Sequence, residues 1–160
     1  MIVVSDASPL IALASIDRLD LLGRLFDAVI IPTAVHTEVF GTSIHRRPIL
    51  PGFIRLTPVS QASSVRFLRL NLHVGESEAI ALALEHGIER IILDDKQARE
   101  TANRLGLMVV GTLGILILAK QKGHLMEIRP LVLSMMTNVN FRLSPSILNR
   151  ALAHVGEPLL

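Results

Sequence analysis

The sequence contains no cysteine, no tryptophan and no tyrosine among its 160 residues. Without cysteine, a disulfide scaffold, a thiolate metal site and a cysteine nucleophile are all excluded. The absence also fits a reducing compartment, and we expect the protein in the cytoplasm. Because tyrosine and tryptophan are absent, five phenylalanines supply all of the large aromatic rings. We therefore expect any contact with nucleic acid to be mainly electrostatic, with little base stacking.

Charged residues are also scarce, at 19% of the chain, whereas half of the residues are hydrophobic. This balance excludes a disordered chain, and the length suits one domain with a sizeable core. The first residues have no basic segment typical of a signal peptide. The most apolar run, at 107–119, is too short to cross a bilayer. We expect no membrane association.

Acidic residues are missing from two long stretches, between Glu38 and Glu76 and between Glu127 and Glu157. The net charge is only +2, so the distribution of charge is more informative than its sum. The first stretch contains five arginines and the second contains three. Such segregation favours contact with a polyanion along one face. The alternative, ordinary solvated arginines on a small domain, stays open at this point.

Apolar segments alternate with segments of helical periodicity along the chain. Strands are predicted at 1–6, 28–32, 90–94 and 107–111, with a strand or extended connection at 53–59. Helices are predicted at 8–26, 32–40, 63–71, 73–87, 95–106 and 112–123, and the last helix begins near residues 144–145. The strands lack alternation of polar and apolar residues, as expected when helices cover both faces of a sheet. The fold class is therefore α/β, a single three-layer domain with a central parallel sheet flanked by helices.

Acidic residues follow two of the predicted strands directly. Asp6 ends the first strand, and Asp94 and Asp95 end the strand at 90–94. Glu38 lies in the helix after the second strand, and Glu76 opens the helix that precedes Asp94. Because the carboxyl ends of parallel strands share one edge of a sheet, four separate segments can bring carboxylates together there.

Clustered carboxylates must share protons, pair with lysine or arginine, or bind a hard cation. Oxygen ligands alone favour Mg²⁺ or Mn²⁺ over zinc, and the six histidines form no H-x-x-x-H pair. We therefore expect a divalent metal beside Asp94, with Lys96 or Arg99 assisting.

Several of these residues also have an ordinary structural interpretation. Ser8 and Asp95 are both suited to cap a helix. Arg99 can form an i,i+4 ion pair with Asp95, and Glu38 can be a solvated helix acid. Glu78 lies two residues beyond Glu76 and points elsewhere on an ideal helix, which favours a structural role for it.

Five motifs in this order resemble the PIN domain, and in particular its short prokaryotic, toxin-related members. They are "DASPLI" at 6–11, "PTAVHTEV" at 32–39, "GESEAIALALEHG" at 75–87, "ILDDKQARETANRLGL" at 92–107 and "VGTLGIL" at 110–116. The resemblance covers residues 1–125, a PIN-like nuclease domain. Residues 126–160 are then expected to form a helical extension that packs on the same domain.

The resemblance implies a Mg²⁺- or Mn²⁺-dependent ribonuclease. The acids of the family fall on Asp6, Glu38, Glu76 and Asp94, with Glu76 standing where aspartate is usual. Asp95 is a spare acid that adds to the possible metal ligands. The hydroxyl two residues after the first acid matches Ser8.

For the substrate, Lys96 and Arg99 are expected at the scissile phosphate, and Arg46 and Arg47 along the RNA. The toxin-related members imply an antitoxin partner. The apolar helices at 8–16 and 112–120 favour a homodimer. A PIN-like protein that binds RNA or a partner without cutting is the alternative. A phosphoacceptor signalling domain fits less well, because its aspartate pair follows the first strand.

Overall fold

The computed structural model describes residues 1–42 and 49–160, and its centre is a parallel sheet of five strands. The strands are β1 (Ile2–Ser5), β2 (Ala28–Ile31), β3 (Ile54–Leu56), β4 (Arg90–Ile92) and β5 (Met108–Val110). Their spatial order is β3-β2-β1-β4-β5, and every neighbouring pair is parallel. This confirms the α/β fold with a central parallel sheet.

Helices connect the strands and cover the sheet. They are α1 (Ala7–Ser15), α2 (Asp20–Leu25), α3 (Thr33–Phe40), α4 (Ala62–Leu68), α5 (Val74–Glu85), α6 (Lys96–Arg104), α7 (Thr112–Gln121), α8 (Arg129–Asn138) and α9 (Pro145–His154). None of the helices in the described ranges is long and apolar enough to pass through a membrane.

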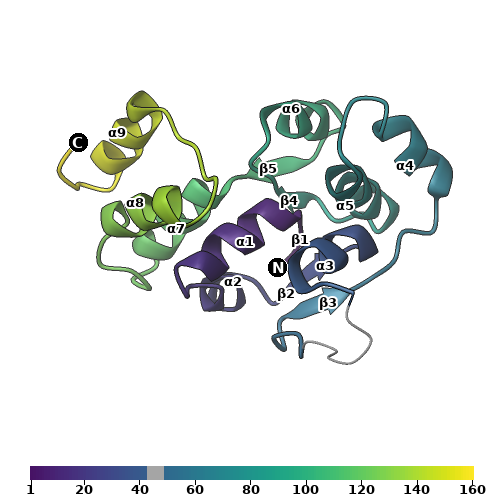
Figure 1. Cartoon of the computed structure of the whole chain (residues 1–160), viewed down its shortest axis with the longest axis horizontal. Coiled ribbons are helices and arrows are strands. Elements are labelled where there is room, and N and C mark those ends of the chain that lie inside the picture. Colours follow the sequence, from purple (N-terminus) through teal and green to yellow (C-terminus); the bar gives the residue numbers. More distant parts are fainter. Residues whose placement is uncertain (43–48) are drawn as a thin grey trace.

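Successive strand residues point to opposite faces of the sheet, so they are buried in two separate hydrophobic cores. Val3 is buried with residues of α1, α2 and α7, whereas its neighbour Val4 is buried with residues of α5 and α6. Figure 1 shows these two groups of helices on either side of the strands. Because both faces are covered, the strands need no polar face, which explains the continuous apolar runs in the sequence.

The prediction of a single helix over 8–26 is wrong. Helix α1 ends at Ser15, and α2 begins only at Asp20. Between them, Asp17 adopts a positive φ of 55°, a conformation that aspartate tolerates better than most residues. The helix also begins one residue before Ser8, because Asp6 occupies the N-cap position. The prediction that Ser8 caps this helix is therefore wrong as well.

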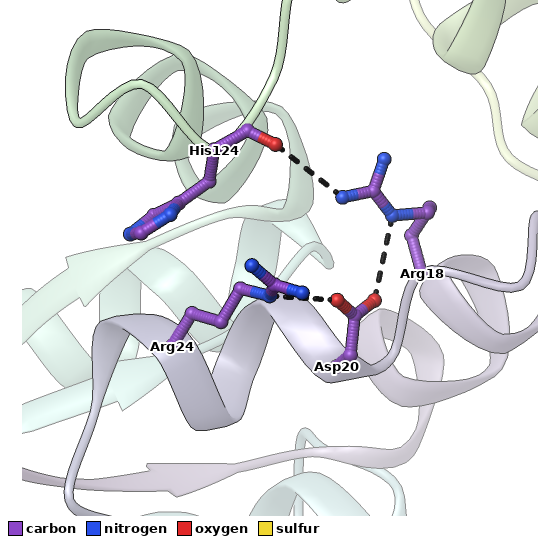
Figure 2. Close-up of polar contacts among 4 residues, drawn as sticks. All are labelled: Arg18, Asp20, Arg24 and His124. Atoms are coloured by element: carbon purple, nitrogen blue, oxygen red, sulfur yellow. Dashed lines mark hydrogen bonds and ion pairs between the residues drawn. The ribbon is translucent and has the colours of Figure 1, made fainter.

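A polar contact fixes this turn against the far end of α7. Arg18 donates to the backbone carbonyl of His124 at 3.5 Å and to Asp20 at 3.4 Å. Asp20 also accepts a 2.9 Å bond from Arg24, one turn further along α2 (Figure 2). These exposed pairs contribute little energy individually, but they connect the α1–α2 turn to the loop that leads into α8.

Helices α8 and α9 belong to the same core as α1 and α7. Val132 and Met135 of α8 and Leu148 and Leu152 of α9 are buried within that hydrophobic cluster. Figure 1 shows both helices beyond α7, at the end of the molecule opposite α4. Residues 126–160 thus pack on the rest of the chain, while the domain boundary at residue 125 stays a prediction.

Candidate active site

The two strands that end in acidic residues are neighbours at the centre of the sheet. β1 pairs with β4, with Ser5 opposite Ile92, and the Asp6 amide donates a 3.1 Å hydrogen bond to the Ile92 carbonyl. From β1 the chain proceeds to β2 and β3 on one side, and β4 and β5 lie on the other. The strand order therefore reverses between β1 and β4, where open α/β sheets bind their ligands.

Asp6 lies at this reversal and is almost fully buried, with 4% of its surface exposed. Burial raises the pKa of its carboxyl to about 7, although the Ala7 amide partly offsets this effect. The negative charges of Glu76, Glu38 and Asp94 raise the pKa further. The fold therefore brings these four predicted site residues, which come from four separate segments, into one electrostatic cluster.

A glycine in α5 makes room for two of these carboxylates. A Cβ atom on Gly75 would lie 3.1 Å from Asp6 Oδ1 and 3.5 Å from Glu38 Oε2. Both oxygens thus approach the same small space beside the helix backbone. A larger residue at position 75 would occupy the place where the carboxylates meet.

The structure separates the roles of Glu76 and Glu78. Glu76 is buried, and its Oε2 accepts a 3.1 Å hydrogen bond from the His73 amide, as a glutamate at the third helical position often does. Burial raises the pKa of Glu76, and the charges of Asp95 and Glu38 add to this effect. Glu78 instead accepts a 2.7 Å bond from the Ala34 amide at the start of α3. Glu76 therefore faces the cluster, and Glu78 secures a neighbouring helix.

Asp94 is held by a residue that the sequence analysis did not identify. Thr112 donates from its amide to Asp94 Oδ1 at 2.8 Å and from its hydroxyl to Asp94 Oδ2 at 2.6 Å. Thr112 is fully buried in the first turn of α7. The available signal is a hydroxyl residue directly after the predicted strand at 107–111, within the motif "VGTLGIL"; from the sequence we relate the helix at 112–120 only to a homodimer.

Asp95 caps α6, since its Oδ1 accepts a 2.9 Å hydrogen bond from the Ala98 amide. Ser8 is exposed in the first turn of α1. It lines a surface groove, and Asp94 and Asp95 line the same groove.

Lys96 and Arg99 of α6 line this groove too. A Cβ atom on Gly111 would lie 2.6 Å from Arg99 Nη1 and 3.1 Å from Asp94 Oδ1, so both side chains lie beside the backbone of Gly111. The ion pairs among the described residues do not include one between Arg99 and Asp95. Arg46 and Arg47 lie outside the described residues.

The donors at the site suit a hard divalent cation, because all of them are carboxylate or hydroxyl oxygens. Within residues 1–42 and 49–160, no three acidic or histidine side chains converge into a complete metal-binding group. Burial and, to a smaller extent, the repulsion of the neighbouring carboxylates raise the pKa of Asp6, and a cation would relieve that repulsion. Asp6, Glu38, Glu76 and Asp94 are the residues that would hold it.

A family model for the PIN domain matches residues 2–157. The chain belongs to the PIN domain family. The match includes α8 and α9 as well as the five-stranded sheet. No curated protein and no solved structure matches the chain significantly. PIN domains are in general nucleases, and they typically use divalent metal ions.

Proposed function

We propose that this PIN domain protein is a Mg²⁺- or Mn²⁺-dependent ribonuclease that hydrolyses RNA phosphodiester bonds. The observation that carries the proposal is the approach of Asp6 and Glu38 to the same space beside Gly75. Glu76 and Asp94 complete the cluster, since their charges also act on Asp6. Oxygen ligands from four segments at the sheet reversal are the donor set that a hard cation needs.

When bound, a divalent cation lowers the pKa of a coordinated water and stabilises the charge that develops on the phosphate. The residues around it orient the ligands. The His73 amide positions Glu76, and Thr112 holds both oxygens of Asp94. Lys96 and Arg99 line the adjoining groove, where they would bind the scissile phosphate. Ser8 would hydrogen-bond a ligand carboxylate or the attacking water.

We also propose that the protein is the toxin of a toxin–antitoxin pair, in the cytoplasm, and that it forms a homodimer. The resemblance of its motifs to toxin-related PIN proteins supports this proposal. An antitoxin that covers the groove would then control cleavage. Light scattering that gives a mass near 17.5 kDa, the mass of one chain, would contradict the homodimer.

A second candidate is a PIN domain that binds RNA without cutting it. Two observations favour it: the glutamate at position 76, where aspartate is usual, and the lack of a complete three-ligand group among the described residues. The two functions make different predictions for the purified protein. Only a nuclease shortens RNA when Mg²⁺ is added.

The test is cleavage of end-labelled single-stranded RNA with Mg²⁺, with Mn²⁺ and with a chelator. We expect cleavage only with metal and none from Asp6→Asn. Glu127→Gln, which changes an exposed acid near α8, is the matched control and should cleave as the parent does. If Asp6→Asn cleaves normally while remaining folded, the proposed metal site is wrong. If the parent binds RNA but does not cleave it, the second function is correct.

A further inference from the structure

A groove of about 1110 Å³ begins at the acidic cluster and runs beyond it. Ser8, Glu76, Asp94 and Asp95 line one end. The remaining walls come from α1, α6, β5 and α7, and from the α8–α9 connection and the start of α9. Figure 1 shows α6 and α9 well separated, with the connection between α8 and α9 passing on the α9 side. The volume lies close to the upper end of the usual range for small-molecule sites.

The walls of the groove are partly apolar and partly basic. Ile11, Leu113 and Ile117 contribute half-buried aliphatic surface, and these residues also pack on the core beneath. Lys96, Arg99 and Arg142 supply positive charge along the walls. The acids of the lining are Glu100 and, at the end near the cluster, Glu76, Asp94 and Asp95. A single-stranded nucleic acid presents both kinds of surface, because its phosphates are anionic and its bases have apolar faces.

Phe141 occupies the α8–α9 connection at the edge of this groove. The ring is half-buried against the core, and it also lines the groove. The Phe141 amide donates a 2.7 Å hydrogen bond to the Val139 carbonyl. Next to it, Arg142 Nε donates a 2.9 Å bond to Asn140 Oδ1, so the connection has local hydrogen bonds that support both side chains.

We propose that this groove holds the single-stranded RNA beside the scissile phosphate, with one base stacked on Phe141 and one backbone phosphate at Arg142. This inference rests on the proposed function, because the acidic cluster at the end of the groove is the site of cleavage. Continuity with that cluster and the three basic side chains along the walls favour an RNA over an apolar protein segment. Base stacking thus has a place that the small number of phenylalanines in the sequence does not suggest.

The test compares RNA that carries bases with RNA that contains stable abasic units, in the full-length Asp6→Asn protein, which is expected not to cleave. Fluorescence anisotropy gives the affinities. We expect Asp6→Asn to bind the base-bearing strand at least about fivefold more tightly than the abasic strand. Adding Phe141→Leu, which keeps an apolar contact with the core, should remove most of that difference. Phe141→Trp should restore it.

Two matched changes outside the groove serve as controls. Phe67 in α4 is the same residue type, is 73% exposed and does not line the groove, so Phe67→Leu should leave the preference for bases intact. Arg142→Gln should weaken the binding of both RNAs equally. It should also reduce the slope of log affinity against log salt concentration by about one unit. Arg104→Gln, at the end of α6 and away from the groove, should not change this slope.

The possible failures can be told apart. If the parent cleaves RNA but Phe141→Leu keeps the preference for bases, the groove is not the RNA path, while the proposed function stands. If the parent does not cleave and Phe141→Leu still loses the preference, the proposed function fails and the groove remains an RNA site. If Phe141→Leu converts a dimer into a monomer without any change in RNA affinity, a second copy of the chain fills the groove and the inference is overturned.

Discussion

Thr112 holds both oxygens of Asp94, one through its amide at 2.8 Å and the other through its hydroxyl at 2.6 Å. The two residues follow neighbouring strands, β4 and β5, at the same edge of the sheet. The arrangement places a carboxylate at the N-terminus of α7, where the helix dipole and a free amide stabilise negative charge. Thr112 therefore orients Asp94 while leaving it beside the groove.

The first prediction changes Thr112 to valine, which has nearly the same shape but no hydroxyl. One oxygen of Asp94 then loses its partner, and we expect the free energy of unfolding to fall by about 1–2 kcal/mol. RNA cleavage should fall by roughly tenfold or more. Thr112→Ser, which restores the hydroxyl, should recover most of the activity. If Thr112→Val loses stability but cleaves like the parent, the hydrogen bond serves the fold alone.

The second prediction concerns the pH dependence of stability without metal. The pKa of Asp6 is about 7 in the folded protein, against an ordinary value of 3.8 for an aspartate. Between these two values the folded state binds more protons than the unfolded state, so the free energy of unfolding falls as the pH rises. The loss amounts to about 4 kcal/mol at most. Chemical denaturation at about pH 4.5 and about pH 7.5 measures it, and Asp6→Asn should abolish most of the difference.

The third prediction adds the metal to the same measurement. A cation requires ionised ligands, so it competes with the proton on Asp6. Millimolar Mg²⁺ or Mn²⁺ should therefore raise the melting temperature at about pH 7.5 and have much less effect at about pH 5. The response should shrink in Asp94→Asn. A melting temperature that is indifferent to both cations at either pH would show that the acids are balanced by protons or basic side chains.

The sequence was sufficient to predict the sheet, the positions of its strands and the edge at which the acids meet, because these depend on local patterns. The break between α1 and α2 was not predictable in the same way, because residues 8–26 keep helical spacing through the turn at Asp17. The pairing of Thr112 with Asp94 joins residues 18 positions apart. Such a contact between distant positions depends on the tertiary structure, which the local periodicity of the sequence does not specify.

The fourth prediction concerns Glu157 and the last two helices. Its carboxylate accepts hydrogen bonds from Lys120 Nζ at 2.7 Å and from the amides of Ile128 and Arg129 at 2.7 and 2.9 Å. Burial alone would raise the pKa of Glu157, but these donors outweigh burial and lower the pKa below 4.5. The contribution to stability is thus complete above about pH 4.5 and is lost as the pH falls through the lowered pKa.

Glu157→Gln should lower the free energy of unfolding at pH 7 by roughly 2–3 kcal/mol, because Lys120 loses its charged partner in a mostly buried place. Glu127→Gln removes an exposed charge nearby and should change stability by less than about 0.5 kcal/mol. Denaturation curves of both variants give the comparison. Equal stabilities would mean that the ion pair contributes nothing to the attachment of α8 and α9.

The last prediction concerns Gly75, where a substitution should disturb the acidic cluster without changing the stability of the fold. Gly75 lies in the first turn of α5, where alanine is ordinarily the better helix former by up to about 1 kcal/mol. Its Cβ would nevertheless approach Asp6 Oδ1 to 3.1 Å and Glu38 Oε2 to 3.5 Å. The Asp6 carboxylate would have to shift by a few tenths of an ångström, whereas the contact with Glu38 is an ordinary van der Waals contact. A divalent cation tolerates little displacement of its ligands.

Gly75→Ala should therefore keep the stability of the metal-free protein within about 1 kcal/mol of the parent. Both the rise in melting temperature with Mg²⁺ and the rate of RNA cleavage should fall, the latter by roughly tenfold or more. Gly52→Ala is the matched control, since a Cβ there meets nothing within 4 Å, and it should behave as the parent does. If Gly75→Ala responds to metal and cleaves RNA normally, Asp6 and Glu38 do not act together, and the proposed ligand set must be redrawn around Glu76 and Asp94.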